Sequence, residues 1–284
     1  MVNFYRIDLQ ESAPEKKKRV MKPDSKAIRR IILEQSYRAG VGHIGSALSV
    51  ADILALLYGR ILEIPGAEAP HRDRFVLSKG HAALALYAAL YLTGRLDETA
   101  LHSYCADDSL LGVHPEHQLP FVDFSTGSLG LGLAYAAGSA LAARLQGSPR
   151  RVYALLSDAE CNEGSLWEAV LFAGHHRLCG LTAIVDNNGQ QAFGYTRNVL
   201  CQESLRDRWQ SMGWRVAEAD GHDVNQMNRE MLSFREERSR PQVLLARTVF
   251  GKGVSYMENE IHWHYWPMNQ DQYQQAIFEL ERTP

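Results

Sequence analysis

The sequence predicts an α/β protein with a mostly parallel β-sheet that helices cover on both faces. Short apolar runs of strand length alternate with longer segments in which apolar residues recur at helical spacing. The runs at 152–156 and 181–185 are almost entirely apolar, which is typical of parallel strands buried on both faces. There is no internal repeat and no low-complexity linker, so we expect one continuous domain over residues 25–284, after an N-terminal arm of residues 1–24.

The predicted elements follow one another in a regular order. Helical spacing of apolar residues predicts a first helix from Ser25 to Arg38, which Gly40 ends. Ser49 is expected to be the N-cap of a second helix that runs to Tyr58, and Asp223 the N-cap of a late amphipathic helix. The other predicted strands are 74–77, 152–156, 181–185, a short strand near 216 and 243–249, and the other predicted helices are one that ends at 92, then 127–145, 166–176 and 205–212.

Composition and charge argue against several classes of function. The net charge of -3 is slight, so nothing favours nucleic acid or an anionic membrane. No apolar run approaches the ~20 residues that span a bilayer, and the N-terminus lacks the apolar core of a signal peptide. The basic residues 16–19 are expected to be a solvated tail. The few scattered cysteines lack C-x-x-C spacing and fit reduced thiols in a cytoplasmic protein.

Two neighbouring predicted strands end in oxygen-bearing residues. Strand 152–156 leads to Asp158, and strand 181–185 leads to Asn188. The carboxyl ends of parallel strands meet at one edge, where open α/β sheets bind ligands, so we expect these two side chains to lie close together. A carboxylate and an amide oxygen are hard donors that suit a Mg²⁺ ion whose other ligands are phosphate oxygens. Glu163, just before the next helix, is a further candidate for a buried carboxylate.

Glycines and histidines add candidates that the sequence leaves open. The segment Gly127 to Gly132 lacks the glycine order of G-x-G-x-x-G, which argues against a dinucleotide-dependent oxidoreductase. This segment is either a closely packed helix start or a backbone that a flat ligand can approach. His43, His81 and His114 each stand beside Gly or Pro at an element boundary, where they could hold phosphate groups and transfer protons near neutral pH. No pair of histidines has the spacing of a zinc site.

A series of motifs, taken together, resembles the N-terminal half of transketolase. Transketolase is a thiamine diphosphate enzyme that moves two-carbon ketol units between sugars. The resemblance covers roughly residue 25 to the C-terminus, and it is closest to split transketolases, in which this half is a separate subunit. The motifs are Gly-His-Ile-Gly-Ser at 42–46, Leu-Ser-Lys-Gly-His at 77–81, Gly-Val-His-Pro-Glu at 112–116, Ser-Thr-Gly-Ser-Leu-Gly at 125–130 and the pair Asp158 and Asn188.

The resemblance implies the thiamine-diphosphate-binding fold of the family's diphosphate (PP) domain. It also implies that the side chains of Asp158 and Asn188 and the backbone carbonyl of Gln190 bind Mg²⁺, which bridges to the cofactor's diphosphate. His81 and His264 resemble the histidines that contact the diphosphate.

The same resemblance assigns the rest of the site. The backbone near Gly127 and Leu129 would lie against the aminopyrimidine, and the Ala159 N–H would face the diphosphate. His43 and His114 would stabilise or protonate the oxyanions of the substrate, while the thiazolium supplies the carbanion chemistry. Glu163 would join a carboxylate network across a subunit interface. The catalytic set expected on this basis is His43, His81, His114 and Glu163.

Three departures from the family pattern bear on affinity and specificity. Ser157 and Ala159 stand where the family has the two glycines of G-D-G, so we expect added side chains to crowd the diphosphate. Leu131 stands where the family usually has Gln. Tyr265 and Trp266 follow His264, where Gly is common, and add bulk beside the substrate channel.

The resemblance also implies a partner. In this family an essential Glu on a second α/β domain contacts the aminopyrimidine, and we expect another polypeptide to supply that domain. We therefore expect a C-terminal transketolase-like subunit with a pyrimidine-binding domain, an α2β2 heterotetramer and no activity when the chain is isolated. The expected activity is ketol transfer from a ketose phosphate to an aldose phosphate. Two alternatives remain: a specialised enzyme with a non-phosphorylated or secondary-metabolic substrate, and a degenerate subunit that only scaffolds its partner.

Overall fold

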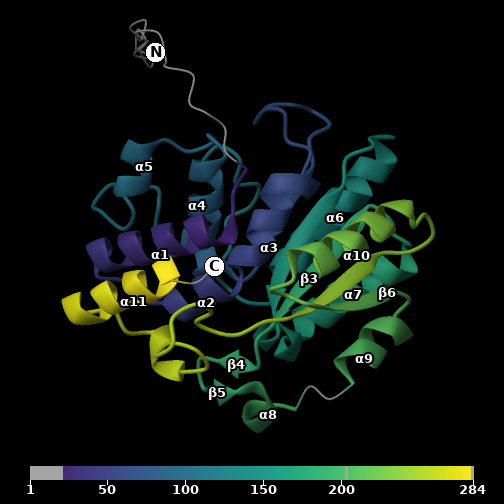
Figure 1. Cartoon of the computed structure of the whole chain (residues 1–284). Coiled ribbons are helices and arrows are strands. Elements are labelled where there is room, and N and C mark those ends of the chain that lie inside the picture. The colour runs from purple at the N-terminus through teal and green to yellow at the C-terminus, as the bar shows by residue number, and fades with distance from the viewer. Residues whose placement is uncertain (1–21, 202–203, 283–284) are drawn as a thin grey trace, which may run out of the picture.

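A five-stranded parallel sheet runs through the centre of the molecule (Figure 1). The computed structural model describes residues 22–201 and 204–282. The strand order is β1-β2-β3-β7-β6, and every neighbouring pair is parallel, so the predicted fold class is confirmed. The strands are β1 (Arg74–Leu77), β2 (Val152–Ser157), β3 (Leu181–Asn187), β6 (Arg215–Asp220) and β7 (Gln242–Arg247), and a small antiparallel hairpin consists of β4 (Gln190–Gln191) and β5 (Gly194–Tyr195).

Strand β2 shows how the sheet is buried. Val152, Ala154 and Leu156 pack into one apolar cluster, whereas Tyr153 and Leu155 pack into a second cluster on the other face. Successive side chains of a strand point to opposite faces, and both faces of this sheet are covered. The strand is therefore apolar at every position up to Leu156, as the sequence analysis expected for a parallel sheet.

Helices form one layer on each face of the sheet. α6, α7 and α9 contribute to the cluster around Val152, and α1–α5, α10 and α11 contribute to the cluster around Tyr153. The bounds are α1 (Ser25–Ala39), α2 (Ile44–Ser49), α3 (Ala51–Leu56), α4 (Ala83–Leu92), α5 (Glu98–His102), α6 (Gly132–Leu145), α7 (Gly164–His175), α8 (Thr196–Val199), α9 (Leu205–Ser211), α10 (Val224–Glu236) and α11 (Gln270–Arg282).

Local capping sets the ends of two of these helices. The Asp223 side chain accepts hydrogen bonds from the backbone N–H groups of Asn225 and Gln226, so the predicted N-cap of α10 is confirmed. Asp24 caps α1 in the same way. Gly40 ends α1 in the left-handed conformation, with φ 64°, which glycine adopts without a steric penalty.

The helix predicted from Ser49 to Tyr58 is built differently. α2 ends at Ser49, α3 follows after Val50, and a single π-helical turn covers Leu57–Ile61. The N-cap prediction for Ser49 is wrong, because its hydroxyl donates to the Asp186 carboxylate (2.8 Å) and to the Ser46 carbonyl (3.0 Å). A polar contact in the core thus outweighs the local capping preference.

One further helix boundary differs from its prediction, and one predicted segment lies outside the described residues. The helix predicted from residue 127 begins at Gly132, so 127–131 form a loop. The basic residues 16–19 lie outside the described residues, and the arm and domain bounds stay a prediction. Across 22–201 and 204–282, no helix is both long and apolar enough to cross a membrane. The four cysteines are all described, and all are free.

Candidate active site

A cavity of about 250 Å³ lies at the carboxyl edge of the sheet. It is bounded by the segments that follow β1, β2 and β3, by the start of α2 and by the short 3-10 helix Ile261–His264. Asp158 lies between two lining residues, whereas Glu163 does not line the cavity. The predicted site residues that line it are His43, His81, His114, Gly127, Leu129, Ala159, Asn188, Gln190 and His264.

Asp158 and Asn188 lie together at the ends of adjacent strands. One carboxylate oxygen of Asp158 accepts a hydrogen bond from the Gly189 N–H (2.7 Å), and the other accepts from the Ala159 N–H (2.9 Å). The Asn188 side-chain oxygen accepts from the Gln190 N–H (2.9 Å). Backbone N–H groups of the loop after β3 therefore orient both predicted metal-binding side chains.

The Asp158 carboxylate is fully buried beside a second carboxylate. Burial and then the negative charge of Asp186 raise the pKa of Asp158 to about 7. Two carboxylates in one buried region repel each other, and a divalent cation beside Asp158 would favour its ionised form. The donor set of one carboxylate, one amide and one backbone carbonyl suits a hard ion such as Mg²⁺.

This donor set contains a single carboxylate. Within the described ranges, no group of three or more His, Cys, Asp or Glu side chains could hold a metal ion. A cation held by Asp158, Asn188 and Gln190 would therefore need oxygen ligands from a bound molecule, as Mg²⁺ commonly has from phosphates.

A buried ion pair lies at the base of the cavity. Lys79 and Asp186 are both fully buried, and the Lys79 ammonium donates to the Asp186 carboxylate and to the Ser46 carbonyl (3.3 Å). The Asn188 side-chain nitrogen also donates to Asp186 (3.0 Å). The pair therefore fixes the amide of Asn188, with its nitrogen directed at Asp186 and its oxygen at the backbone of Gln190.

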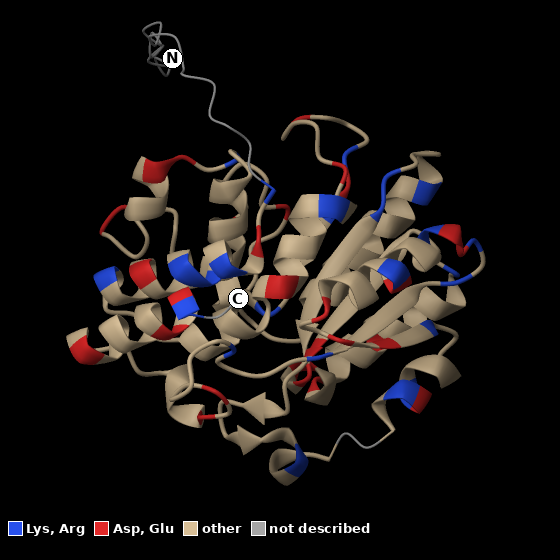
Figure 2. Ribbon diagram, viewed as in Figure 1, with Lys and Arg blue, Asp and Glu red and all other residues tan. Residues whose placement is uncertain are grey.

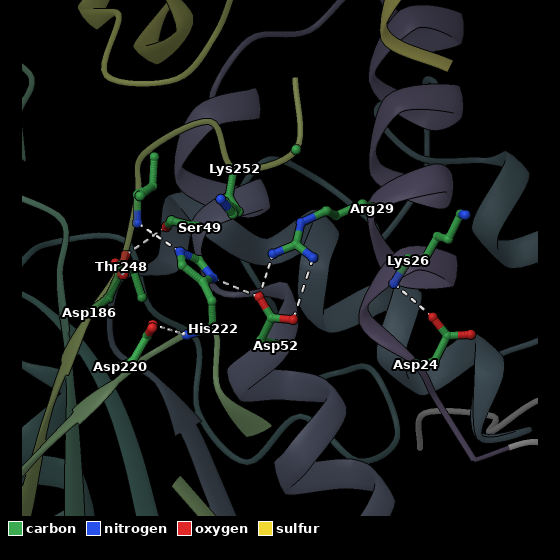
Figure 3. A network of polar contacts seen from close by, with 12 residues as sticks. Asp24, Lys26, Arg29, Ser49, Asp52, Asp186, Asp220, His222, Thr248 and Lys252 are labelled. Carbon is green, nitrogen blue, oxygen red and sulfur yellow. Dashed lines mark hydrogen bonds and ion pairs between the residues drawn. The ribbon is translucent and has the colours of Figure 1, made fainter. Parts of the chain in front are cut away.

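A network of polar contacts extends from Asp186 away from the cavity (Figure 3). Ser49 and Thr248 donate their hydroxyls to Asp186. Next to Thr248, the Val249 N–H donates to Nε2 of His222 (2.9 Å), so the ring proton sits on Nδ1 and is donated to Asp52 (2.7 Å). This network holds the segment that carries Thr248 in place.

Arg29 completes the network at its outer end. Its guanidinium bonds both oxygens of Asp52. Burial alone would raise the pKa of Asp52, but the hydrogen bond from His222 and the charge and hydrogen bonds of Arg29 lower it well below its ordinary value. Asp52 is therefore ionised at neutral pH and anchors both partners.

Three histidines form a cluster on one side of the cavity. The ring centroids of His43 and His81 are 5.7 Å apart, those of His81 and His264 are 5.9 Å apart, and those of His43 and His264 are 6.4 Å apart. Burial lowers the pKa of all three, to about 4 for His264, and neighbouring positive charge such as that of Lys79 lowers it further. Burial also lowers the pKa of His114. All four rings are therefore neutral at pH 7.

The backbone around His43 is shaped to bring its ring into the cavity. His43 has φ 61°, in the left-handed region that non-glycine residues rarely adopt, and its N–H donates to the His264 carbonyl (3.2 Å). At Gly42 an added Cβ would lie 2.3 Å from the Tyr265 carbonyl oxygen. Glycine is thus required at position 42, where the backbone comes close to Tyr265. Strained backbone such as that of His43 often marks functional sites.

Several polar atoms around the cavity are buried without a hydrogen-bond partner among the described residues. They are Nδ1 of His43, Nε2 of His264, both side-chain polar atoms of Gln190 and Nε2 of Gln191. Buried polar groups are almost always paired in folded proteins, because an unpaired one loses its hydrogen bond to water. This concentration around one cavity indicates a polar ligand, so the residues fit a diphosphate-bearing cofactor.

Two predicted residues are placed differently from the expectations. Glu163 is exposed, and the buried carboxylate of this turn is Glu160, which accepts from the N–H groups of Gly130 and Ser157 (both 2.9 Å). The Ala159 N–H donates to the Asp158 carboxylate rather than pointing free into the cavity. The expectation of a buried Glu163 is therefore wrong for this chain by itself, since the turn directs Glu160 inward instead.

The departures from the family pattern can now be located. Ser157 and Ala159 both line the cavity, and the Ser157 hydroxyl is engaged by the Glu160 N–H (3.2 Å). Tyr265 also lines the cavity and is half exposed, so it lies at the mouth. Leu131 is exposed and does not line the cavity.

Two features of the cavity were not predicted from the sequence: the Lys79–Asp186 pair and the lining residue Gln191. Lys79 belongs to a motif that was recognised, and Asp186 is the first polar residue after an apolar run. A charged residue at the end of a strand that is otherwise apolar is the signal that could have found both, because such a residue is buried and needs a partner.

Comparison with known proteins places this architecture in a family. Residues 20–281 match the family model described as "Transketolase, thiamine diphosphate binding domain". A 6-deoxy-6-sulfo-D-fructose transketolase subunit from Clostridium sp. (strain MSTE9) is 37% identical over 260 residues, which cover 90% of this chain and 94% of that protein. An apulose-4-phosphate transketolase subunit from Phocaeicola vulgatus is 36% identical, with 89% and 90% covered.

Solved structures agree with the sequence relatives. The transketolase of Campylobacter jejuni superimposes with a TM-score of 0.85 at 28% identity over 92% of this chain, but the match spans only 42% of that protein. The fold and the family match define an α/β component of a cofactor-dependent enzyme, with a candidate site at the carboxyl edge of the sheet. The chain belongs to the transketolase family of transferases, and it corresponds to the N-terminal, thiamine diphosphate-binding subunit of the split form.

Proposed function

We propose that this chain binds Mg²⁺ and thiamine diphosphate in the carboxyl-edge cavity and, with a partner subunit, transfers a two-carbon ketol unit between sugar substrates. The observation that carries this proposal is the set of buried, unpartnered polar atoms from His43, Gln190, Gln191 and His264 around one cavity. A cofactor that carries a diphosphate and its cation would supply partners for such atoms.

The residues of the chain divide the work of binding. Asp158, Asn188 and the carbonyl of Gln190 would hold the cation, and His81 and His264 would contact the diphosphate. Because burial keeps both histidines neutral, each presents one N–H and one acceptor nitrogen, and neither carries a charge that must be desolvated. The backbone at Gly127 and Leu129 would take the aminopyrimidine, and the thiazolium supplies the carbanion chemistry when it is bound.

Proton transfer falls to His43 and His114. Both line the cavity, and both are neutral because burial lowers the pKa of each ring. A neutral imidazole can accept a proton from a substrate hydroxyl and return it to an oxyanion at neutral pH. The buried Nδ1 of His43 has no partner within the described residues, so it is available to a substrate oxygen.

We propose that the partner carries a pyrimidine-binding domain with the activating Glu, in an α2β2 heterotetramer. Several apolar side chains are exposed on α6, on α7 and just before α6, and an interface with another subunit would cover them. Glu163 borders this surface, since an added Cβ at Gly130 would lie 2.6 Å from its Cβ, and there it would join a carboxylate network across the interface. The exposed side chains are Leu131, Tyr135, Leu171 and Phe172.

The sugar substrate of this chain is expected to be a specialised one. The two relatives named above act on a sulfonated fructose and on apulose 4-phosphate, so related subunits serve specialised sugars. Tyr265 lines the mouth of the cavity in this chain and narrows it, which favours an acceptor other than the usual pentose phosphates. A cytoplasmic location likewise stays a prediction from the cysteine pattern.

Assays of the chain together with its partner test the proposal. We expect saturable binding of thiamine diphosphate with Mg²⁺ and ketol transfer, and we expect His43→Ala to abolish transfer while cofactor binding remains. Turnover of non-standard acceptors alone, with none of pentose phosphates, would support the specialised enzyme. Binding without turnover of any sugar would support the scaffold, and absence of saturable cofactor binding would overturn the proposal.

A further inference from the structure

A second cavity, of about 210 Å³, lies at the amino edge of the sheet. It is lined by residues 148–151, which lead into β2, by residues 178–180, which lead into β3, by the end of α6 and by the loop after α10. The candidate active site lies at the opposite ends of the same strands, so the two cavities are separate and share no lining residue.

Four arginines line this second cavity, and no Asp or Glu does. They are Arg144, Arg150, Arg151 and Arg238. Within residues 22–201 and 204–282, none of the four forms an ion pair. Figure 2 shows basic segments at the end of α6 and on the chain between α6 and β2. In a protein whose net charge is -3, this concentration of unneutralised positive charge is local.

Three arginines of the described residues show how a carboxylate balances a guanidinium that leaves solvent. Arg72 and Arg74 both pair with Asp123, and Arg29 pairs with Asp52. These three arginines are buried or half-buried, as Arg150 and Arg151 are. Two other half-buried arginines, Arg95 and Arg215, form no ion pair with a described residue, but their guanidinium groups donate to the Ile64 carbonyl and to Ser233. The Arg150 Nε has no such acceptor among the described residues.

Helix capping explains only part of this cluster. Helix C-termini attract cations, and Arg144 lies in the last turn of α6, where it donates to the His176 carbonyl. Arg151 donates to the Arg235 carbonyl (2.7 Å). Arg150 and Arg238 lie outside any helix, and in the described residues their side chains make no hydrogen bond to a carbonyl. Helix capping therefore does not explain why Arg150 and Arg238 are arginines.

Arg150 gives the clearest indication of a ligand. Its Nε is buried and has no hydrogen-bond partner among the described residues. A buried guanidinium N–H without an acceptor is unfavourable, and the cavity that Arg150 lines is the place where an acceptor can bind. Arg144 and Arg238 are exposed, so the cavity can be reached from solvent.

We propose that the amino-edge cavity binds a phosphate group, either free phosphate or the phosphate of a small metabolite. Guanidinium groups match the geometry of phosphate oxygens and form charge-assisted hydrogen bonds with them. This site does not depend on the proposed ketol transfer.

Titration of the full chain tests the proposal, with inorganic phosphate, ribose 5-phosphate and ribose as probes, in low salt with EDTA. We expect phosphate to bind and ribose not to bind. Arg150→Gln/Arg238→Gln should raise the dissociation constant at least about tenfold, because two charged donors are lost. Arg229→Gln, an exposed arginine on α10 outside the cavity, is the matched control and should change it less than about twofold.

The probes distinguish free phosphate from a phosphate ester, and the variants distinguish the amino-edge cavity from the carboxyl-edge cavity. Equal affinity for phosphate and ribose 5-phosphate identifies the free phosphate group as the ligand, and tighter binding of the ester identifies a metabolite. His81→Ala should leave this binding intact, because it alters only the carboxyl-edge cavity. Arg238→Gln alone replaces an exposed loop residue and should weaken binding without loss of folding, as thermal unfolding would check.

Three outcomes would overturn the proposal. The first is the absence of phosphate binding at millimolar concentration. The second is binding that survives in Arg150→Gln/Arg238→Gln but disappears in His81→Ala, which would place the phosphate in the candidate active site. The third is binding of a long polyanion such as heparin with no binding of small phosphates, which would indicate a macromolecular surface.

Discussion

The two edges of the sheet differ in the kind of group that lacks a partner among the described residues. At the carboxyl edge the lysine is paired, by Asp186, and the atoms that lack partners among the described residues belong to neutral side chains. At the amino edge arginines are present without carboxylates. Strand ends position both sets, and we propose a metal-bound polar ligand at the carboxyl edge and an anion at the amino edge. The proposed ligands therefore differ because the missing partners differ in kind, not because the two edges differ in the amount of charge.

The largest expected effect comes from breaking the pair at the carboxyl edge. Lys79→Met leaves the Asp186 carboxylate buried without its cation, and we expect a loss of ~3–5 kcal/mol in the free energy of unfolding. Urea denaturation measures this. Lys252→Met is the matched control, because Lys252 pairs with Glu258 at the surface (3.5 Å) and should cost less than ~1 kcal/mol. Equal losses in the two variants would mean that the buried pair is not needed for folding.

Removal of the predicted metal-binding carboxylate should act on binding more than on folding. We expect Asp158→Ala to weaken binding of thiamine diphosphate with Mg²⁺ by more than ~100-fold. The loss of a residue that only orients a metal ligand already lowers metal affinity by ~10–100-fold. Calorimetric titration measures the change. Asp107→Ala, at an exposed position away from the cavity, should leave the affinity unchanged. Similar affinity in both variants would show that Asp158 does not hold the cation.

Cation binding at the carboxyl edge is expected to depend on pH. Burial and Asp186 raise the pKa of Asp158 from 3.8 to about 7. Below the unfolded-state pKa this group contributes fully to stability of the metal-free chain, and the contribution is lost as pH rises through 7. The cation needs the carboxylate, so its affinity should rise about tenfold between pH 6 and pH 8. Titrations at these pH values check this, and Asp158→Asn should show no such dependence from this group.

The smallest effect is expected at the amino edge. Arg150→Gln removes a side chain without an ion pair, so the free energy of unfolding should change by less than ~0.5 kcal/mol. Arg29→Gln, which leaves the buried Asp52 without its ion-pair partner and with only the hydrogen bond from His222, should cost ~3–5 kcal/mol. Urea denaturation of both variants tests the contrast. A large loss in Arg150→Gln would mean that the arginine stabilises the fold, and it would weaken the case for a ligand site there.

Much of the fold could be predicted because the pattern is local. The strands of the main sheet, the capping of α10 by Asp223 and the end of α1 at Gly40 follow from apolar runs, from a carboxylate at a helix start and from glycine. The short elements α5, α8 and the β4–β5 hairpin were missed, because segments this short carry little periodicity. α11 was missed although its length is ordinary.

The candidate site could be predicted less completely. Asp158 and Asn188 were placed at one edge because parallel strands share a direction. Ser49 was misassigned because its partner, Asp186, is distant in the sequence. Glu160 and Glu163 are both acidic residues of one turn, and only the path of the 3-10 helix Ala159–Asn162 decides which of them is buried.

The alternation of strands and helices, the edge at which we expect ligands and the family of the chain all follow from the sequence alone. These depend on periodicity and on the order of motifs, which are read along one dimension. Only the folded chain shows that Lys79 neutralises Asp186, that four histidines line one cavity and that four arginines line another cavity without a carboxylate. The reason is physical: a buried charge or polar atom is stabilised by whatever lies within a few ångströms, and these neighbours come from segments far apart in the chain.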